Sequence, residues 1–362
     1  MIRLVFFSDL ITLAMFFGLF NKKEKSCLGI DFGASGIKIA ELTRQDKNRV
    51  ALTNYVIAQT RIESNINITK LDSEKTAVLL KKLFDRAGIK TKQAVISLSV
   101  GETFSTIINL PQMSEDELIK AIPFQARKYV PIPIEEVVLD WSVVGEFIEQ
   151  KQADSLAKGQ ESQTQEQPKR AEDLLASAET QNAAVKKDIP VQGSKTIQVL
   201  IVAVPQEMIR KIAQIAKETD LKVLAIEQEA FSIIRALVGN DEGTYLVVDF
   251  GQENVDLVIM DKNSIRLTYT FERSKSFDLV LEAVKIINLY QSRYQRKVTR
   301  AILTGGGVTQ SNWLEVFGGK LGIPVGIGDP FARLAHDAKL DAALAEIGPF
   351  MAVAVGGAMR EV

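Results

Sequence analysis

Residues 244–271 read TYLVVDFGQENVDLVIMDKNSIRLTYTF, and this stretch decides the fold because an earlier part of the chain repeats its pattern. A strand, a DFG turn and a second strand also occur in CLGIDFGASGIKIAEL at residues 27–42, and VALTNYVIAQ at residues 50–59 supplies a third strand. An internal repeat of this kind predicts a duplicated α/β architecture with two lobes.

The segments after each repeat predict helices that cover the sheets. The apolar spacing of residues 74–88 predicts a helix that ends at Gly88. Further helices are predicted over residues 274–294, over 311–322 and around 349–361. The helix at 274–294 is expected to turn one face inward, formed by Phe277, Val280, Leu281, Val284 and Ile287.

A different segment lies between the two repeats. Ser114, followed by Glu117, predicts a capping box at a helix start, and Pro123 must shorten or kink that helix. Residues from about 149 to 194 are dominated by Gln, Glu, Lys, Ala and Ser and have no apolar period. We therefore expect a disordered loop that joins two strands of a hairpin.

The composition excludes several classes of function. Lys and Arg total 44 against 45 Asp and Glu, a formal net charge of -1, so the chain has no broad positive field for nucleic acid. One cysteine and one histidine cannot form a zinc site or a disulfide within the chain, and they argue against a histidine-centred triad.

The first residues form an apolar leader. Residues 4–20 contain Asp9 and are slightly short for a membrane span of about 20 residues. Three interpretations stay open, in decreasing order of preference: an extended start before a true start at Met15, an interfacial anchor with NKKEK on the cytoplasmic side, and a genuine span. We expect residues 1–14 to be dispensable for folding.

Three motifs could bind a nucleotide. In the first hairpin, glycines let backbone N–H groups approach phosphate oxygens, Lys38 could reach a phosphate, and Asp31 could hold Mg²⁺ through water. The second hairpin repeats this turn with Asp249 and Gly251, so the two could clasp a polyphosphate from both sides. In LTGGGV at residues 303–308, bare backbone could support a nucleoside. Each motif alone could also be an ordinary turn.

These motifs, in this order and with helices at 227–237 and 349–361, resemble the phosphate-1, connect-1, phosphate-2, adenosine and connect-2 elements of actin-like ATPases. The resemblance covers nearly everything after residue 26. Residues 107–141 look closely like the extra subdomain of type IV pilus PilM proteins, which is placed as in the division protein FtsA. The start read from Met15 and the run GIPVGIGDPF at 322–331 are also similar to this family.

The resemblance implies an actin-like (ribonuclease H-like) duplicated two-lobe ATPase fold with an FtsA-type inserted 1C subdomain. The implied divisions are a leader at 1–26, lobe I at 27–101 and 205–240, the inserted subdomain at 102–204, lobe II at 241–340, and a C-terminal helix at 341–362 that returns to lobe I.

The same resemblance implies roles for individual residues. Asp31 and Asp249 would lie near Mg²⁺, Glu229 would orient water, and Glu229 and Asp249 are the catalytic candidates; Glu229 could equally be the acid of a helix's first turn. Glu282 and Lys285 are candidates for the nucleoside pocket, although a solvated ion pair is the simpler interpretation. The implied phosphate and adenosine contacts are Gly33, Ala34, Ser35, Lys38, Gly251, Gln252, Asn254, Gly305, Gly306 and Gly307.

The second hairpin departs from the superfamily pattern, because Gln252, Glu253 and Asn254 replace small hydroxyl residues. Gln252 and Asn254 can donate to phosphate, whereas a Glu253 carboxylate pointing inward would repel it. We therefore expect ATP and Mg²⁺ to bind and hydrolysis to be slow or absent.

The family resemblance implies a cytoplasmic adaptor, peripheral to the inner membrane, that binds the N-terminal tail of PilN. It would link the PilN/PilO complex to pilus motor ATPases or a platform protein, and self-association stays open. The alternatives are a phosphotransferase such as a sugar kinase, an FtsA-like filament former, and a relative of a type II secretion platform protein. The segment from Phe124 to Trp141 would supply the peptide groove, with Phe124, Arg127 and Tyr129 in contact, unless these aromatics fill the subdomain core.

Overall fold

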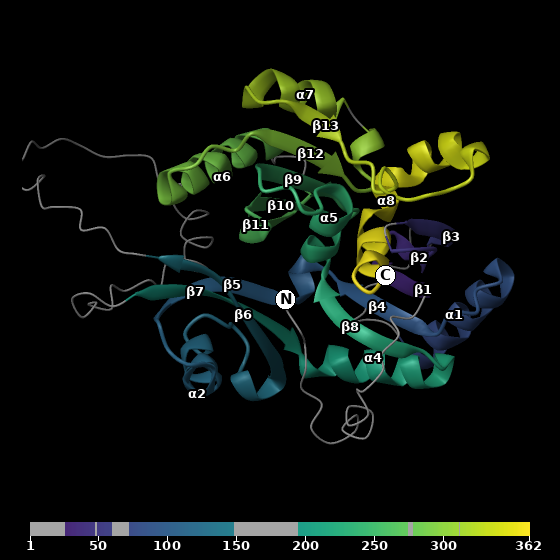
Figure 1. Ribbon diagram of the computed structural model, residues 1–362, viewed down its shortest axis with the longest axis horizontal. Coiled ribbons are helices and arrows are strands. Elements are labelled where there is room, and N and C mark those ends of the chain that lie inside the picture. Colours follow the sequence, from purple (N-terminus) through teal and green to yellow (C-terminus); the bar gives the residue numbers. More distant parts are fainter. Residues whose placement is uncertain (1–25, 48, 60–71, 148–194, 274–277, 311) are drawn as a thin grey trace, which may run out of the picture. The chain divides into compact units, whose positions relative to one another are not determined.

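The computed structural model describes residues 26–47, 49–59, 72–147, 195–273, 278–310 and 312–362. These residues divide into two compact units: Phe104–Val204 and the rest of the described chain (Figure 1). The leader up to residue 25 and the loop predicted at about 149–194 lie outside the described residues.

Two five-stranded sheets of identical strand order build the larger unit, which confirms the predicted duplication. In each sheet the first three strands are antiparallel, and the first strand also pairs in parallel with the fourth. The first sheet has the order β3-β2-β1-β4-β8, with β1 (Ser26–Gly33), β2 (Gly36–Arg44), β3 (Val50–Gln59), β4 (Gln93–Leu98) and β8 (Lys222–Gln228). The second has the order β11-β10-β9-β12-β13, with β9 (Thr244–Phe250), β10 (Asn254–Asp261), β11 (Ser264–Glu272), β12 (Arg300–Thr304) and β13 (Val325–Ile327).

Some helices of the larger unit begin and end at capping residues that can be recognised in the sequence. Helix α1 (Ser73–Ala87) starts where the Asp72 side chain accepts two backbone N–H groups, and it ends at Gly88, whose φ of 67° is left-handed. The predicted stop at Gly88 is confirmed. The other helices are α4 (Gln206–Thr219), α5 (Glu229–Leu237), α6 (Leu279–Tyr294), α7 (Trp313–Leu321) and α8 (Asp341–Met359), with short 3₁₀ turns at Val100–Glu102, Val308–Gln310 and Ala338–Leu340.

The inward face predicted for α6 is partly wrong. The helix begins after Asp278, whose side chain accepts the Leu281 N–H, and Leu281 is 50% exposed. Residue 277 lies outside the described residues. Tertiary packing fixes the rotation of the helix, because the fully buried Tyr290 must face the sheet. The buried face consists of Leu279, Val280, Ala283, Ile286, Ile287 and Tyr290.

Helix α8 packs in the centre of the larger unit, against β1, β2 and α5 (Figure 1). A Cβ atom on Gly29 would overlap the backbone of Ala354, and one on Gly356 would overlap the carbonyl of Ser232. The helix is long and apolar enough to cross a membrane, but 61% of its apolar window is buried within the fold. Among the described residues no other helix meets that test.

A buried ion network holds the end of α8. The Glu227 carboxylate, on β8, accepts from Arg235 at 2.7 Å and from Arg360 at 2.6 Å. Burial raises the pKa of Glu227, but the two guanidinium groups outweigh it and the pKa is lowered. This carboxylate therefore stays charged in the interior and ties strand, helix α5 and the chain end together.

The smaller unit is a three-stranded sheet covered by one helix. Strand β7 (Thr196–Pro205) lies between β5 (Phe104–Pro111) and β6 (Val137–Phe147), so the predicted pairing of the strands on either side of the long loop is confirmed. Helix α2 (Glu115–Ala126) begins with the predicted capping box and continues through Pro123; a 3₁₀ turn, Ile134–Glu136, follows. The core of the smaller unit includes Ile108, Leu110, Leu118, Ile122, Val130, Val199 and Ile201.

Candidate functional site

Both DFG hairpins and the triple glycine line one cleft of about 680 Å³ in the larger unit. The first hairpin contributes Asp31, Gly33, Ala34, Ser35 and Lys38. The lining from the rest of the unit includes Ser99, Gly101, Glu102, Glu229, Asp249, Gly251, Gln252, Glu253, Asn254, Asp256, Arg273, Gly305, Gly306, Gly307 and Phe350. Duplication thus brings turns that are over 200 residues apart in the sequence to one site.

The first hairpin carries a buried ion pair. Asp31 lies opposite Lys38 in the β1–β2 ladder, and Lys38 Nζ donates to Asp31 Oδ2 at 2.8 Å. Burial acts to lower the pKa of Lys38, but the carboxylates of Asp31, Asp249 and Glu229 outweigh it and raise this pKa. Lys38 is therefore charged and forms an ion pair with the Asp31 carboxylate.

The second hairpin has the same register but a different charge. Asp249 lies opposite Asp256, so an acid occupies the place that Lys38 has in the first hairpin. Asp256 was not among the residues predicted from the sequence. The equal seven-residue spacing of Asp31 to Lys38 and of Asp249 to Asp256 could have revealed it.

Glu229 faces these acids from the first residue of α5. Its carboxylate accepts the Val100 N–H at 2.9 Å and shares a hydrogen bond with Asp256. Burial, followed by repulsion from Asp256, Asp249 and Asp31, raises the pKa of Glu229 well above its ordinary value. With its pKa raised, Glu229 keeps its proton to a higher pH than an ordinary glutamate, and the protonated form is a poor proton acceptor.

The acidic cluster favours a cation. Burial, with repulsion from Asp256, raises the pKa of Asp249 to about 7, and burial raises that of Asp256 to about 6. Within the described part of the chain, no three acidic, histidine or cysteine side chains are grouped closely enough to hold a metal directly. This donor set fits Mg²⁺, which commonly keeps its waters and takes only one or two carboxylates together with ligand phosphates.

The glycine turn after β12 lies tightly against the second hairpin. Gly305 has a left-handed φ of 87°, and a Cβ there would overlap Asp249 Oδ1. Its N–H donates to Pro349 O at 2.9 Å, and the Gly307 N–H donates to Phe250 O at 2.8 Å. These contacts fix bare backbone at the cleft wall, where no side chain would fit.

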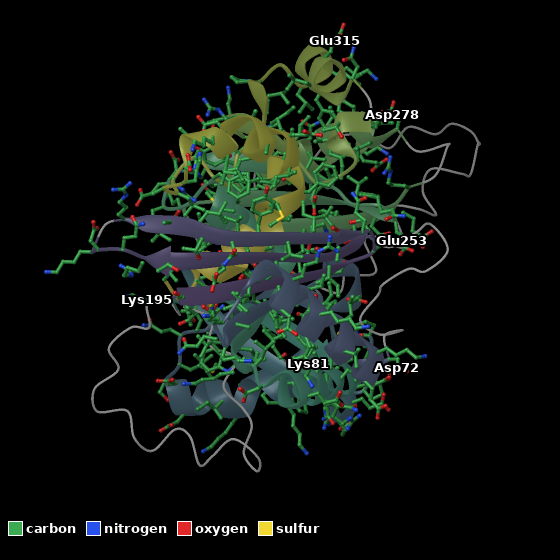
Figure 2. The ribbon with its side chains drawn as sticks, turned by 90° about the vertical axis from the view of Figure 1, so that its right-hand side faces the viewer. Asp72, Lys81, Lys195, Glu253, Asp278 and Glu315 are labelled. Atoms are coloured by element: carbon green, nitrogen blue, oxygen red, sulfur yellow. The ribbon has the colours of Figure 1, made fainter. Side chains whose placement is uncertain are left out.

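The remaining predicted residues lie in different places. Glu253 is part of the cleft lining, and Figure 2 shows it near the margin of the molecule. Glu282 and Lys285 do not line the cleft, and they form an ion pair of 2.8 Å on α6. Phe124, Arg127 and Tyr129 belong to the smaller unit.

The raised pKa values predict how stability depends on pH. In the folded protein Asp249 and Asp256 keep their protons to higher pH, whereas in the unfolded chain they release them near the ordinary aspartate pKa of 3.8. The free energy of unfolding therefore falls as pH rises from about 4 to about 7. We expect Asp256→Asn to lose less Tm than wild type between pH 5 and pH 8 in buffer without divalent cations. The difference should be roughly 2–4 °C for each kcal/mol relieved.

Differential scanning calorimetry measures this directly. The matched control is Asp85→Asn, an exposed position on α1 that should follow the wild-type profile. Parallel profiles for Asp256→Asn and wild type would contradict the repulsion inferred for the cluster.

Comparison with known proteins shows which families and folds this chain resembles. Residues 29–160 match the family described as type IV pilus assembly protein PilM. A chain of a "PilM-PilN type IV pilus biogenesis complex" superposes with a TM-score of 0.68 at 21% identity, over 94% of this chain and 99% of that one. A protein of unknown function with an actin-like ATPase fold from Bacteroides thetaiotaomicron gives 0.42 at 10% identity, over 91% and 99%. The cytoplasmic domain of EpsL from Vibrio cholerae gives 0.40 at 11%, over 77% and 82%.

Proposed function

We propose that this chain, which has the actin-like fold and matches the PilM family over residues 29–160, binds Mg-ATP and acts as the adaptor of a type IV pilus assembly platform. The observation that carries the nucleotide proposal is the meeting of both DFG hairpins and the triple glycine in one cleft. Bound Mg²⁺ would neutralise phosphate charge beside Asp31 and Asp249, through water.

The other residues of the cleft have separate roles in this proposal. Backbone N–H groups at Gly33, Ala34 and Ser35 approach the phosphates, with Lys38 as a nearby positive charge. Gly251, Gln252 and Asn254 do the same from the second hairpin, and Gly305, Gly306 and Gly307 support the nucleoside. Glu282 and Lys285 are not included, because they lie outside the lining.

We propose slow hydrolysis. Glu229 is the group that would orient water, and burial with repulsion from Asp256 and Asp249 raises its pKa, which favours the protonated form and makes it a weaker proton acceptor. Glu253 adds a further acid to the lining of the same cleft. A phosphate-release assay that shows turnover of several per second, within the ordinary range of enzymes, would contradict this.

The partner in this proposal is the cytoplasmic N-terminal tail of a PilN-type membrane protein. The chain would then lie at the cytoplasmic face of the inner membrane and link a PilN/PilO complex to motor ATPases or a platform protein. The support is that the PilM match extends from the first hairpin through β5, α2 and β6 of the smaller unit.

Helix α2 offers a surface for such a peptide. Phe124 is 66% exposed, so it does not fill the core of the smaller unit. Arg127 forms an exposed ion pair with Glu135 at 3.1 Å, which adds a polar rim. Tyr129 packs partly against the core, as does Trp141. Phe124 and Arg127 are therefore the sharper tests of peptide binding.

Fluorescence anisotropy with a labelled tail peptide tests this assignment. We expect Phe124→Ala and Arg127→Ala to weaken binding by about 1 to 2 kcal/mol, roughly 10-fold, because interface anchors lose this much or more. Tyr129→Ala should weaken binding too, with some loss of stability. Circular dichroism checks folding.

The control is Val143→Ala, which truncates an apolar residue of the same unit that is 47% exposed on β6. Its affinity should equal that of wild type. Full affinity in folded Phe124→Ala and Arg127→Ala would place the peptide elsewhere.

A further inference from the structure

Arg273 occupies a position between the two lobe II turns of the cleft. It follows the last residue of β11, and its backbone N–H donates to Glu253 O at 2.9 Å. Its guanidinium donates from Nη1 to Gly251 O at 3.2 Å. The backbone bond to Glu253 and the side-chain bond to Gly251 place the Arg273 side chain across the second DFG turn.

The glycine turn meets the same guanidinium. A Cβ atom on Gly307 would lie 3.1 Å from Arg273 Nη1, closer than side chains ordinarily pack. Gly307 thus leaves room for the cation. Arg273 is therefore in reach of both the turn predicted to meet phosphates and the turn predicted to meet the nucleoside.

The charge balance of the cleft indicates a role for this cation. Six acids line the cleft: Asp31, Glu102, Glu229, Asp249, Glu253 and Asp256. Only two basic side chains, Lys38 and Arg273, stand against them in the lining. A bound polyphosphate adds more negative charge, and Lys38 already pairs with Asp31 at 2.8 Å.

The two repeats also differ in where they carry a cation. In the first hairpin the second strand supplies Lys38, opposite Asp31. In the second hairpin the matching place holds Asp256, so β10 contributes an acid there. The next strand, β11, ends at Glu272, and Arg273 follows it beside the same turn. Lobe II thus obtains its positive charge one strand later than lobe I.

We propose that Arg273 binds the phosphate chain of the nucleotide from the lobe II side, as a specificity residue for nucleoside di- and triphosphates. This inference rests on the proposed nucleotide binding. A guanidinium suits the role because its planar set of five donors can bond phosphate oxygens while it keeps the bond to Gly251.

Isothermal titration calorimetry on the full chain tests the proposal with Mg-ATP and Mg-ADP, and competition with labelled ATP measures adenosine. Arg273→Met should weaken both nucleotides about 10- to 100-fold, the range for a lost hydrogen bond to a charged group. The affinity for adenosine should change less than about twofold, because adenosine has no phosphate to which Arg273 could donate. Arg273→Lys keeps the positive charge but loses the planar set of donors, so its loss of nucleotide affinity should be intermediate.

Arg300→Met is the matched control, because Arg300 is exposed at the other end of β12 from the glycine turn. It should bind all three ligands as wild type does. Unchanged ATP affinity in folded Arg273→Met and Arg273→Lys would overturn the role of Arg273 alone. Equal losses for ATP and adenosine would also overturn it and assign the residue to holding the turn. If wild type binds no nucleotide, the proposed function fails together with this inference.

Discussion

A Gly356→Ala variant is expected to lose about 3 kcal/mol or more of its folding stability. A Cβ atom at this position would overlap the carbonyl oxygen of Ser232, which belongs to the backbone of α5 and cannot rotate away. Helix α8 would have to move off α5 and off β1, where Gly29 is equally close to Ala354. Overpacked cores usually lose about 1–3 kcal/mol, and a backbone overlap belongs at or above the top of that range.

Thermal unfolding followed by circular dichroism measures the loss. The matched control is Gly318→Ala, which also substitutes a glycine within a helix, α7, but into open space. That change should be neutral or stabilise by up to about 1 kcal/mol, since alanine is the better helix former. If both variants melt within a few degrees of wild type, the packing described for α8 is wrong.

Asp249→Asn is expected to weaken Mg-dependent ATP binding on the order of 100-fold, as losses of metal-positioning carboxylates do. Asp249 lies beside Gly305 and opposite Asp256, at the point where the hairpin and the glycine turn meet. Loss of one carboxylate removes attraction for the cation, and the amide is nearly the same size.

The same substitution should raise the stability of the protein without ligand. Its pKa of about 7 means that ionised Asp249 is unfavourable in the folded state above neutral pH, and asparagine removes that charge. Calorimetric titration at pH 8 measures the Mg-ATP affinity, and the Tm at the same pH measures the stability of the protein without ligand. Asp85→Asn serves again as control. Undiminished Mg-ATP affinity would exclude Asp249 from the proposed metal site, whatever happens to the Tm.

Sequence patterns predicted the elements that depend on local signals and repetition. The two DFG hairpins indicated the duplication, Gly88 indicated the end of α1, and the capping box indicated the start of α2. Each signal works because it acts within a few residues of backbone.

Features that depend on register or on packing across elements were not predictable in this way. Asp256 was missed because its seven-residue spacing from Asp249 gains meaning from the strand pairing that places the two residues opposite each other. The exposed Leu281 was misplaced because the buried Tyr290, farther along α6, sets the rotation of the helix. Arg273 was missed because it has no motif of its own; β11 brings it to Gly251 and Gly307.

The most direct test of the adaptor role is the affinity of the wild-type chain for a synthetic N-terminal tail of PilN, measured by anisotropy with and without Mg-ATP. A scrambled peptide of the same composition is the control. We expect saturable binding of the native tail, and a change in affinity with Mg-ATP would show that the cleft and the peptide surface are coupled. No binding of the native tail under either condition would contradict the proposal that this chain is a PilM-type adaptor.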